Sequence, residues 1–183
     1  NNKKKKDKLI IKDNKKLYEM QEPIGVVALI IPWNFPMIVL SERLPYILAA
    51  GNTVIIKPSE NGTLSIDYFI RIIENSGLPN GTVNYLTGDY KTGKYLAENK
   101  NISMISFTGS TKTGKEIYRN ASTTLKRLSL ELGGKNPMAV FSDANLNKAC
   151  DEVIYSFTHN AGQCCVSGSR LFVEKKISLK FIE

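Results

Sequence analysis

Residues 24–57 read IGVVALIIPWNFPMIVLSERLPYILAAGNTVIIK, and this stretch decides the fold. The apolar run Ile24 to Ile31 predicts a buried strand, and Thr53 to Lys57 predicts a second one. Between them, Met37 to Ala50 predicts a helix that ends at Gly51, a residue typical of helix C-termini. Parallel neighbouring strands need a crossover, which is usually a helix. The stretch therefore predicts a strand–helix–strand unit.

The same alternation continues along the chain. Further strands are expected at Thr82–Leu86, Met104–Thr108, Lys126–Glu131, Pro137–Phe141 and Arg170–Val173. Further helices are expected at Thr63–Ser76, Tyr90–Glu98, Thr111–Ala121 and Asn145–His159. The pattern predicts an α/β protein with an open, doubly wound, mostly parallel sheet and helices on both faces. Ligands of such sheets bind at the carboxyl ends of the strands.

The positive charge is concentrated at the N-terminus. Eight lysines and two aspartates give residues 1–16 a net charge of +6, out of +8 for the chain. We expect a basic polar tail here, with a nucleic-acid-binding arm as the alternative. The remaining residues are nearly neutral, so we expect no nucleic-acid partner for the body of the protein.

Size and composition indicate a globular protein. The chain has 183 residues, of which 42% are hydrophobic, and three cysteines. These values exclude a disordered or disulfide-stapled protein. No apolar run is long enough to span a bilayer, so we expect no membrane association. The odd cysteine count, with Cys164 and Cys165 adjacent, favours the reducing cytoplasm.

Cys165 is a candidate nucleophile. It lies among glycine, glutamine and serine residues after a predicted helix, whereas Cys150 lies on the apolar face of that helix. Small neighbours let a substrate approach a thiolate, although an inert cysteine is the alternative. His159, the only histidine, fits a partner of the helix C-terminus better than a base. No histidine or cysteine cluster has the spacing of a metal site, so no metal is expected.

Glu131 is a candidate acid or base. It ends an apolar strand and precedes Gly133 and Gly134. A carboxylate in such a place is costly unless it is paired or used. The alternative is a surface-facing residue of an alternating strand.

Two motifs compete in the glycine-rich stretch Gly109 to Lys115. The first is the first half of a phosphate-binding P-loop, but Glu116 stands where Ser or Thr must hold Mg²⁺. The second is a dinucleotide-binding turn in which Thr111 replaces the second glycine and Gly114 is the last. Both place phosphate at a helix N-terminus.

Five segments in this order resemble the aldehyde dehydrogenase superfamily, from about Glu22 to Val173. They are Pro32-Trp33-Asn34-Phe35-Pro36, Lys57-Pro58-Ser59-Glu60, Phe107-Thr108-Gly109-Ser110, Leu130-Glu131-Leu132-Gly133-Gly134-Lys135 and Gly162-Gln163-x-Cys165.

The resemblance implies a role for each matched residue. Cys165 would be the nucleophile, Asn34 would stabilise the oxyanion, and Glu131 would activate the hydrolytic water. The cofactor NAD would be held by Trp33, Lys57, Glu60, Gly109, Ser110 and Gly114. Glu60 favours NAD over NADP, because a carboxylate accepts a hydrogen bond from a ribose hydroxyl and repels a phosphate.

The resemblance also implies a domain organisation. We expect a Rossmann-like dinucleotide-binding domain over residues 17–135 and the start of a catalytic domain over residues 136–183. The expected activity is oxidation of a small-molecule aldehyde by a cytoplasmic enzyme that is a homo-oligomer at full length. The chain resembles only part of such an enzyme, so we expect these 183 residues alone to be inactive. The alternative is an inactive nucleotide-binding remnant.

Overall fold

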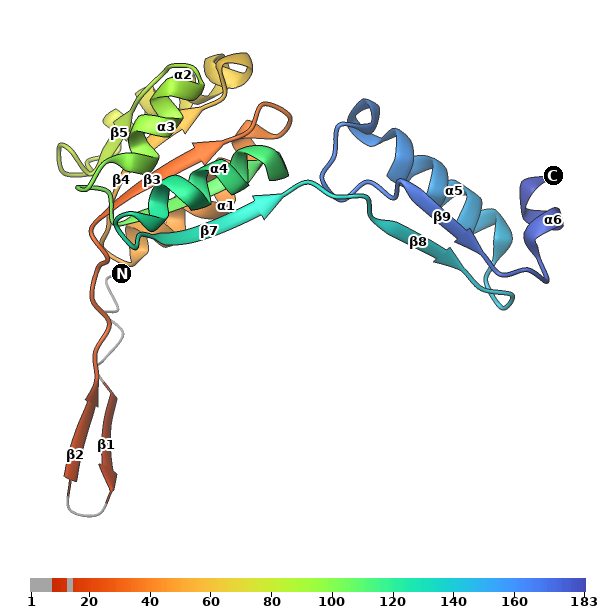
Figure 1. The fold of residues 1–183 in the computed structure, drawn as a ribbon, viewed down its shortest axis with the longest axis horizontal. Coiled ribbons are helices and arrows are strands. Elements are labelled where there is room, and N and C mark those ends of the chain that lie inside the picture. Colours follow the sequence, from red (N-terminus) through yellow and green to blue (C-terminus); the bar gives the residue numbers. More distant parts are fainter. Residues whose placement is uncertain (1–7, 13–14) are drawn as a thin grey trace. The chain divides into compact units, whose positions relative to one another are not determined.

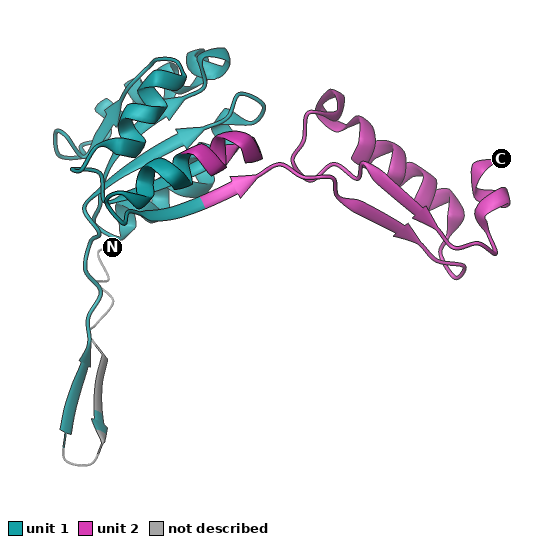
Figure 2. Cartoon of the chain, in the orientation of Figure 1, with its two compact units in different colours: residues 1–107, 117–129 teal, residues 108–116, 130–183 magenta. Residues whose placement is uncertain are grey.

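The computed structural model describes residues 8–12 and 15–183, which form two compact units (Figure 2). Unit 1 contains the described residues up to 107, together with 117–129. Unit 2 contains residues 108–116 and 130–183. The expected boundary between domains after residue 135 stays a prediction.

A five-stranded sheet forms the centre of the fold, in the order β5-β4-β3-β6-β7 (Figure 1). β3 pairs in parallel with both β4 and β6, and β4 pairs in parallel with β5. The predicted mostly parallel sheet is therefore confirmed. The chain order reverses at β3, the kind of switch point where parallel sheets bind ligands. The strands are β3 (Val26–Ile31), β4 (Thr53–Pro58), β5 (Val83–Tyr85), β6 (Met104–Gly109) and β7 (Arg127–Leu132).

Two helices, α1 (Pro36–Ala49) and α2 (Thr63–Glu74), pack against one face of the sheet. Their buried side chains form one core cluster with alternate residues of β3 and β4, as the two-residue period of a strand requires. Pro36 at the first turn of α1 fits the helix start, because its missing N–H would have no partner there. The cluster contains Leu29, Ile31, Leu40, Leu44, Val54, Ile56, Ile66 and Ile70.

The opposite face is also buried. Ala28 and Ile30 alternate with the cluster residues of β3 and are paired with Ile105 and Phe107 of β6. The helix α4 (Thr111–Ser122) crosses the front of the sheet in Figure 1, while α1 lies behind. α3 (Tyr90–Glu98) and α4 contribute the buried residues Leu96, Ala97, Ile117 and Ala121. Helices thus cover both faces, as the sequence predicts.

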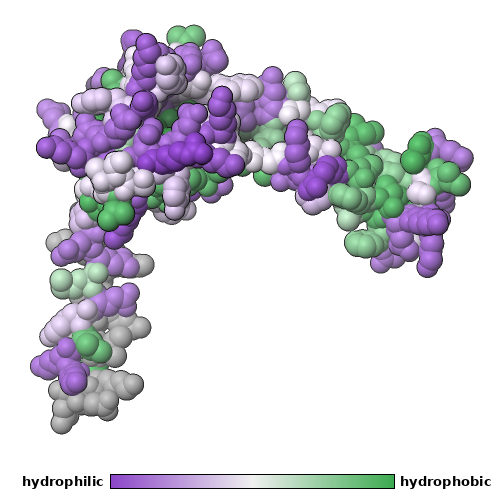
Figure 3. Space-filling model, in the orientation of Figure 1, coloured by the Kyte–Doolittle hydropathy of each residue, from purple (hydrophilic) through white to green (hydrophobic). Residues whose placement is uncertain are grey.

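Unit 2 contains a small sheet and a helix. β8 (Pro137–Val140) pairs in parallel with β9 (Arg170–Val173), and the crossover contains α5 (Leu146–Thr158). A short helix, α6 (Ser178–Ile182), follows β9. Much apolar surface is exposed here (Figure 3), including Ile154, Tyr155, Phe157, Phe172, Leu179 and Ile182.

The N-terminal segment contains two strands. β1 (Lys8–Lys12) pairs antiparallel with β2 (Lys15–Glu19), and Lys8 lies opposite Glu19. The sequence predicts only a polar tail over residues 1–16, of which 1–7 and 13–14 lie outside the described residues. Among the described residues, no helix is both long and apolar enough to cross a membrane.

Candidate functional site

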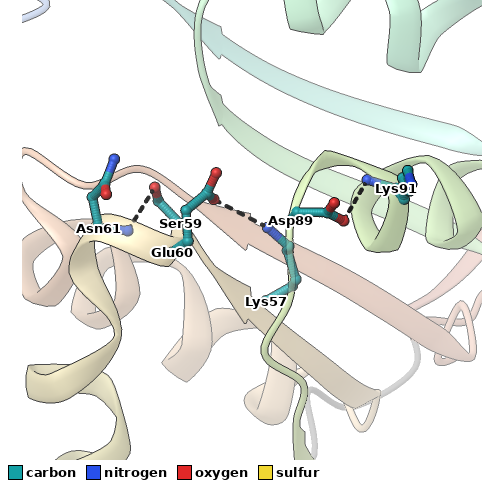
Figure 4. A network of polar contacts seen from close by, with 6 residues as sticks. All are labelled: Lys57, Ser59, Glu60, Asn61, Asp89 and Lys91. Carbon is teal, nitrogen blue, oxygen red and sulfur yellow. Dashed lines mark hydrogen bonds and ion pairs between the residues drawn. The ribbon is translucent and has the colours of Figure 1, made fainter.

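Lys57 lies at the carboxyl end of β4, with its side chain almost completely buried. Its Nζ lies 3.9 Å from the exposed carboxylate of Glu60 (Figure 4). Glu60 begins a short 3-10 turn, Glu60–Gly62. Ser59 fixes this turn, because its Oγ accepts a hydrogen bond from the backbone N–H of Asn61 at 3.4 Å. A cationic donor and a carboxylate acceptor therefore stand side by side, a pair that suits the hydroxyls of a ribose.

A second carboxylate acts on the same lysine. Asp89 follows β5, and the N–H of Leu86 donates to the carbonyl of Ile56 at 2.9 Å, so the ends of β4 and β5 are adjacent. Asp89 caps α3 by accepting a hydrogen bond from the Lys91 N–H at 2.9 Å (Figure 4). Burial lowers the pKa of Lys57 below its ordinary value, while the negative charges of Glu60 and Asp89 oppose that shift.

Trp33 and Asn34 lie in the loop between β3 and α1, at the carboxyl end of β3. Trp33 is exposed and Asn34 is half-buried. This loop contacts the turn after β4: a Cβ added at Gly62 would lie 3.3 Å from the Trp33 Cα. The Ser59 N–H donates to the Ile31 carbonyl at 2.9 Å. Unit 1 thus brings together Trp33, Asn34, Lys57 and Glu60 at the ends of two adjacent strands.

The glycine-rich stretch forms the predicted strand-to-helix turn. β6 ends at Gly109, and α4 begins at Thr111. Ser110 caps this helix: its Oγ accepts a hydrogen bond from the Thr113 N–H at 3.1 Å and donates to Thr113 Oγ1 at 2.9 Å. A Cβ at Gly114 would lie 2.6 Å from Leu132 Cδ2, so glycine lets α4 approach β7 closely. The helix N-terminus could hold a phosphate.

The turns after β6 and β7 are joined by two hydrogen bonds. The Gly133 N–H donates to the Gly109 carbonyl at 3.2 Å, and Thr111 Oγ1 donates to the Gly133 carbonyl at 3.3 Å. Glu131, near the end of β7, is exposed. The structure therefore places the glycine-rich turn beside the strand end that carries Glu131.

Cys165 is exposed, while Cys164 and Cys150 are half-buried. It follows the 3-10 segment His159–Gly162, in which Asn160, Ala161 and Gly162 all have positive φ. Left-handed φ values are unusual for alanine, so the backbone conformation of the segment that leads to Cys165 cannot be predicted from sequence patterns. His159 packs its ring against Tyr155, 5.1 Å between centroids.

Residues without a predicted role anchor the Cys165 loop. Asn136 Nδ2 donates to the carbonyls of Cys165, at 2.7 Å, and Ser167, at 3.2 Å. Ser156 on α5 accepts two hydrogen bonds, each at 2.9 Å. Its main-chain carbonyl accepts one from Ser167 Oγ, and its own Oγ accepts the other from the Gly168 N–H. These contacts join segments far apart in the sequence, which is why sequence reasoning missed Asn136 and Ser156. The segment Leu86 to Tyr90 did contain a signal for Asp89, since aspartate before a helix is a common cap.

We expect a Gly168→Ala substitution to destabilise unit 2. The added Cβ would overlap the Met138 side chain and lie 2.9 Å from Ser156 Oγ. Overpacking of this kind costs about 1–3 kcal/mol. Urea unfolding measures the loss, with Gly93→Ala as the control, because that Cβ would meet nothing within 4 Å. Equal stability of the two variants would contradict the tight packing at Gly168.

The candidate catalytic and cofactor-binding residues fall into two groups, one in each unit. Unit 1 holds Trp33, Asn34, Lys57 and Glu60; unit 2 holds Gly109, Ser110, Gly114, Glu131 and Cys165. Over residues 8–12 and 15–183, no three His, Cys, Asp or Glu side chains are placed to bind a metal ion.

Comparison with known proteins gives consistent matches. Aldehyde dehydrogenase (NAD(P)+) 2 of Saccharomyces cerevisiae is 45% identical over 172 residues, which cover 93% of this chain and 34% of the relative. The NAD-dependent aldehyde dehydrogenase of Sinorhizobium meliloti superposes with a TM-score of 0.85 at 45% identity, covering 88% of this chain and 32% of that one. Betaine aldehyde dehydrogenase of Staphylococcus aureus, crystallised with NAD+, gives 0.93 at 35% identity, with 96% and 35% covered.

The chain thus spans about a third of the length of these relatives. The sequence profile described as the aldehyde dehydrogenase family matches residues 2–183, almost the whole chain. The five sequence segments, the order of the strands and these matches all indicate the same family. The chain belongs to the aldehyde dehydrogenase family.

Proposed function

We propose that this chain carries the nucleophile and the cofactor-binding residues of an enzyme that oxidises an aldehyde to a carboxylic acid with NAD. The observation that carries the proposal is the exposed Cys165, on a loop anchored by the side chains of Asn136 and of Ser156 on α5, in a chain of this family. The three cysteines are free, which fits a reducing cytoplasm. A homo-oligomeric state of the full-length protein stays a prediction.

Cys165 starts the proposed reaction. Its thiolate adds to the carbonyl carbon of the aldehyde and forms a C–S bond, which leaves a negative charge on the oxygen. The amide of Asn34 and the backbone N–H of Cys165 would donate hydrogen bonds to that oxygen. Donors aimed at a developing oxyanion lower the barrier by about 3–4 kcal/mol each.

Oxidation then converts the adduct into a thioester. When bound, NAD supplies a hydride acceptor for the hydrogen on the former carbonyl carbon. The C–O double bond reforms as that hydrogen leaves with its electron pair. Glu131 would take a proton from a water molecule, whose oxygen attacks the thioester carbon. The C–S bond breaks, the acid departs, and the Cys165 thiolate is restored.

The residues present fit a dinucleotide. Lys57 is buried with its ammonium group beside the Glu60 carboxylate, a cation–anion pair that could bind the hydroxyls of the adenosine ribose. The N-terminus of α4 would receive the pyrophosphate through Gly109 and Ser110, and the absence of a side chain at Gly114 keeps the helix close to the sheet. Trp33, exposed at the end of β3, would line the cofactor cleft.

The charge around Lys57 supports NAD rather than NADP as the cofactor. Two carboxylates, Glu60 and Asp89, act on this one ammonium group. The 2′-phosphate of NADP would add negative charge at a place where carboxylates already outnumber the cation.

We expect Glu60→Gln to raise the affinity for NADP relative to NAD. Removing one charge near a phosphate at a partly exposed site is worth about 1–2 kcal/mol, or roughly tenfold in the ratio of dissociation constants. Isothermal titration with each cofactor measures it. Asp67→Asn is the matched control, because Asp67 pairs with Arg71 on α2. A ratio unchanged by Glu60→Gln would contradict this basis for the preference.

The proposal is tested by expressing the longest reading frame that contains residues 1–183, hereafter the full-length protein. NADH formation is followed with short aliphatic, branched and aromatic aldehydes. We expect NAD-dependent absorbance change with at least one of them. A protein that binds NAD and oxidises none of these aldehydes would contradict the proposal.

A further inference from the structure

Asn136 is the side chain that holds the main chain of Cys165. Its Nδ2 lies 2.7 Å from the Cys165 carbonyl oxygen and 3.2 Å from that of Ser167. Its own carbonyl accepts a hydrogen bond from the Arg170 N–H at 3.2 Å, where β9 begins. The residue itself is half-buried and immediately precedes β8. It therefore ties the Cys165 loop to the start of the small parallel sheet.

The loop is a closed turn with a second anchor. The Ser167 N–H donates to the Cys164 carbonyl at 3.2 Å, so Cys165 lies inside a turn. Ser156 of α5 holds the exit of that turn through Ser167 and Gly168. The Asn136 contact acts on Cys165 itself. Because the carbonyl and the thiol of Cys165 share one Cα, fixing the carbonyl also fixes the origin of the side chain.

We propose that Asn136 is a positioning residue that sets the Cys165 main chain for attack on the aldehyde. This inference rests on the proposed function, since it assumes that Cys165 is the nucleophile. The side-chain type suits this role, because a carboxamide has two N–H donors and both acceptors are carbonyls, which cannot donate. Alanine would supply no donor, and an ionised aspartate would place its charge against two carbonyl oxygens.

The same contact reaches the oxyanion donor. The Cys165 N–H, one of the two proposed donors, belongs to the residue whose carbonyl Asn136 holds. A shift of that residue therefore moves the nucleophile and an oxyanion donor together. Misplacement by about 1 Å costs roughly 10²-fold in rate, so the loss of one hydrogen bond could have a large kinetic effect.

The test compares Asn136→Ala and Asn136→Ser in the full-length protein by rapid mixing with NAD and aldehyde. For Asn136→Ala we expect the rate constant of the first NADH turnover to fall about 10²-fold. The burst amplitude per folded enzyme and the affinity for NAD should stay within twofold. Asn136→Ser keeps one hydroxyl donor and should give an intermediate rate constant. The control is Asn75→Ala, which also removes an amide-to-carbonyl bond, to Arg71 at 2.8 Å on α2.

Hydrogen exchange of the backbone amides in residues 164–168 gives a readout that does not need activity. We expect exchange there to quicken at least about tenfold in Asn136→Ala and to be unchanged in Asn75→Ala. A smaller amplitude per total enzyme with an unchanged rate constant would mean that Asn136 only stabilises the fold, and would overturn the inference. So would unchanged exchange. A wild-type protein that binds NAD but forms no NADH with any of the aldehydes would instead contradict the proposed function, and exchange would still decide whether Asn136 holds the loop.

Discussion

We expect aldehyde oxidation by the full-length protein to be lost when serine replaces Cys165 and to be largely retained when serine replaces Cys164. The neighbours differ in their surroundings: Cys165 is exposed, whereas Cys164 is half-buried. Only Cys165 keeps the Gly162-Gln163-x-Cys spacing. A serine hydroxyl is far less acidic than a thiol and is a weak nucleophile without an adjacent base. We expect kcat to fall by at least about 10³-fold in Cys165→Ser.

The measurement is the initial rate of NADH formation for the two variants, with Cys150→Ser as a third. Cys150 lies on α5 and has no role in the proposed reaction. NAD affinity, measured by titration, should be the same in all three variants, because none of them alters the proposed dinucleotide site. Loss of activity in Cys164→Ser together with retention in Cys165→Ser would show that the nucleophile is wrongly assigned.

Glu131→Gln should leave the first turnover nearly intact and stall the second. The carboxylate is assigned to the water that hydrolyses the thioester, and not to hydride transfer. Losing a general base slows its step by roughly 10² to 10⁴. Glutamine keeps the size of the side chain on this exposed position of β7. The expected trace is a burst of NADH close to the enzyme concentration, followed by little further change.

Two checks accompany this variant. Mass spectrometry of the stalled protein should find the acyl group on the peptide that contains Cys165. Hydroxylamine, a strong nucleophile that needs no protein base, is added after the excess aldehyde has been removed, because it condenses with aldehydes to oximes. It should release the acyl group as a hydroxamic acid, and fresh aldehyde and NAD should then give a second burst. An equal decrease of the burst and of the steady state would mean that Glu131 acts in the fold and not in hydrolysis.

Most of the regular structure could be predicted from the sequence because the apolar periodicity is strong and the helix stops are clear. The strands from β3 to β9 lie within two residues of their predicted bounds. At the N-terminus the many lysines predict a polar tail, yet Leu9 to Ile11 and Leu17 to Tyr18 are apolar runs typical of short strands. The prediction of a polar tail therefore gave more weight to the high lysine content than to these short apolar runs.

Side-chain contacts between distant segments could not be predicted. The bond from Asn136 to Cys165 links residues whose distance in space depends on the pairing of β8 with β9, and that pairing has no local sequence signature. The effect of Asp89 on Lys57 likewise depends on the pairing of β4 with β5. The sequence motifs were enough to name Cys165 and Lys57 as candidate site residues. The tertiary structure was needed to find Asn136 and Asp89, which act on them.

The most direct measurement of the central claim follows an aldehyde labelled with deuterium on its carbonyl carbon. The full-length protein is incubated with this aldehyde and NAD, and both products are analysed by mass spectrometry. Hydride transfer from the carbonyl carbon of the aldehyde predicts one deuterium in the reduced nicotinamide for each molecule of carboxylic acid formed. Reduced nicotinamide without deuterium, or an aldehyde left unchanged by a protein that binds NAD, would contradict the account.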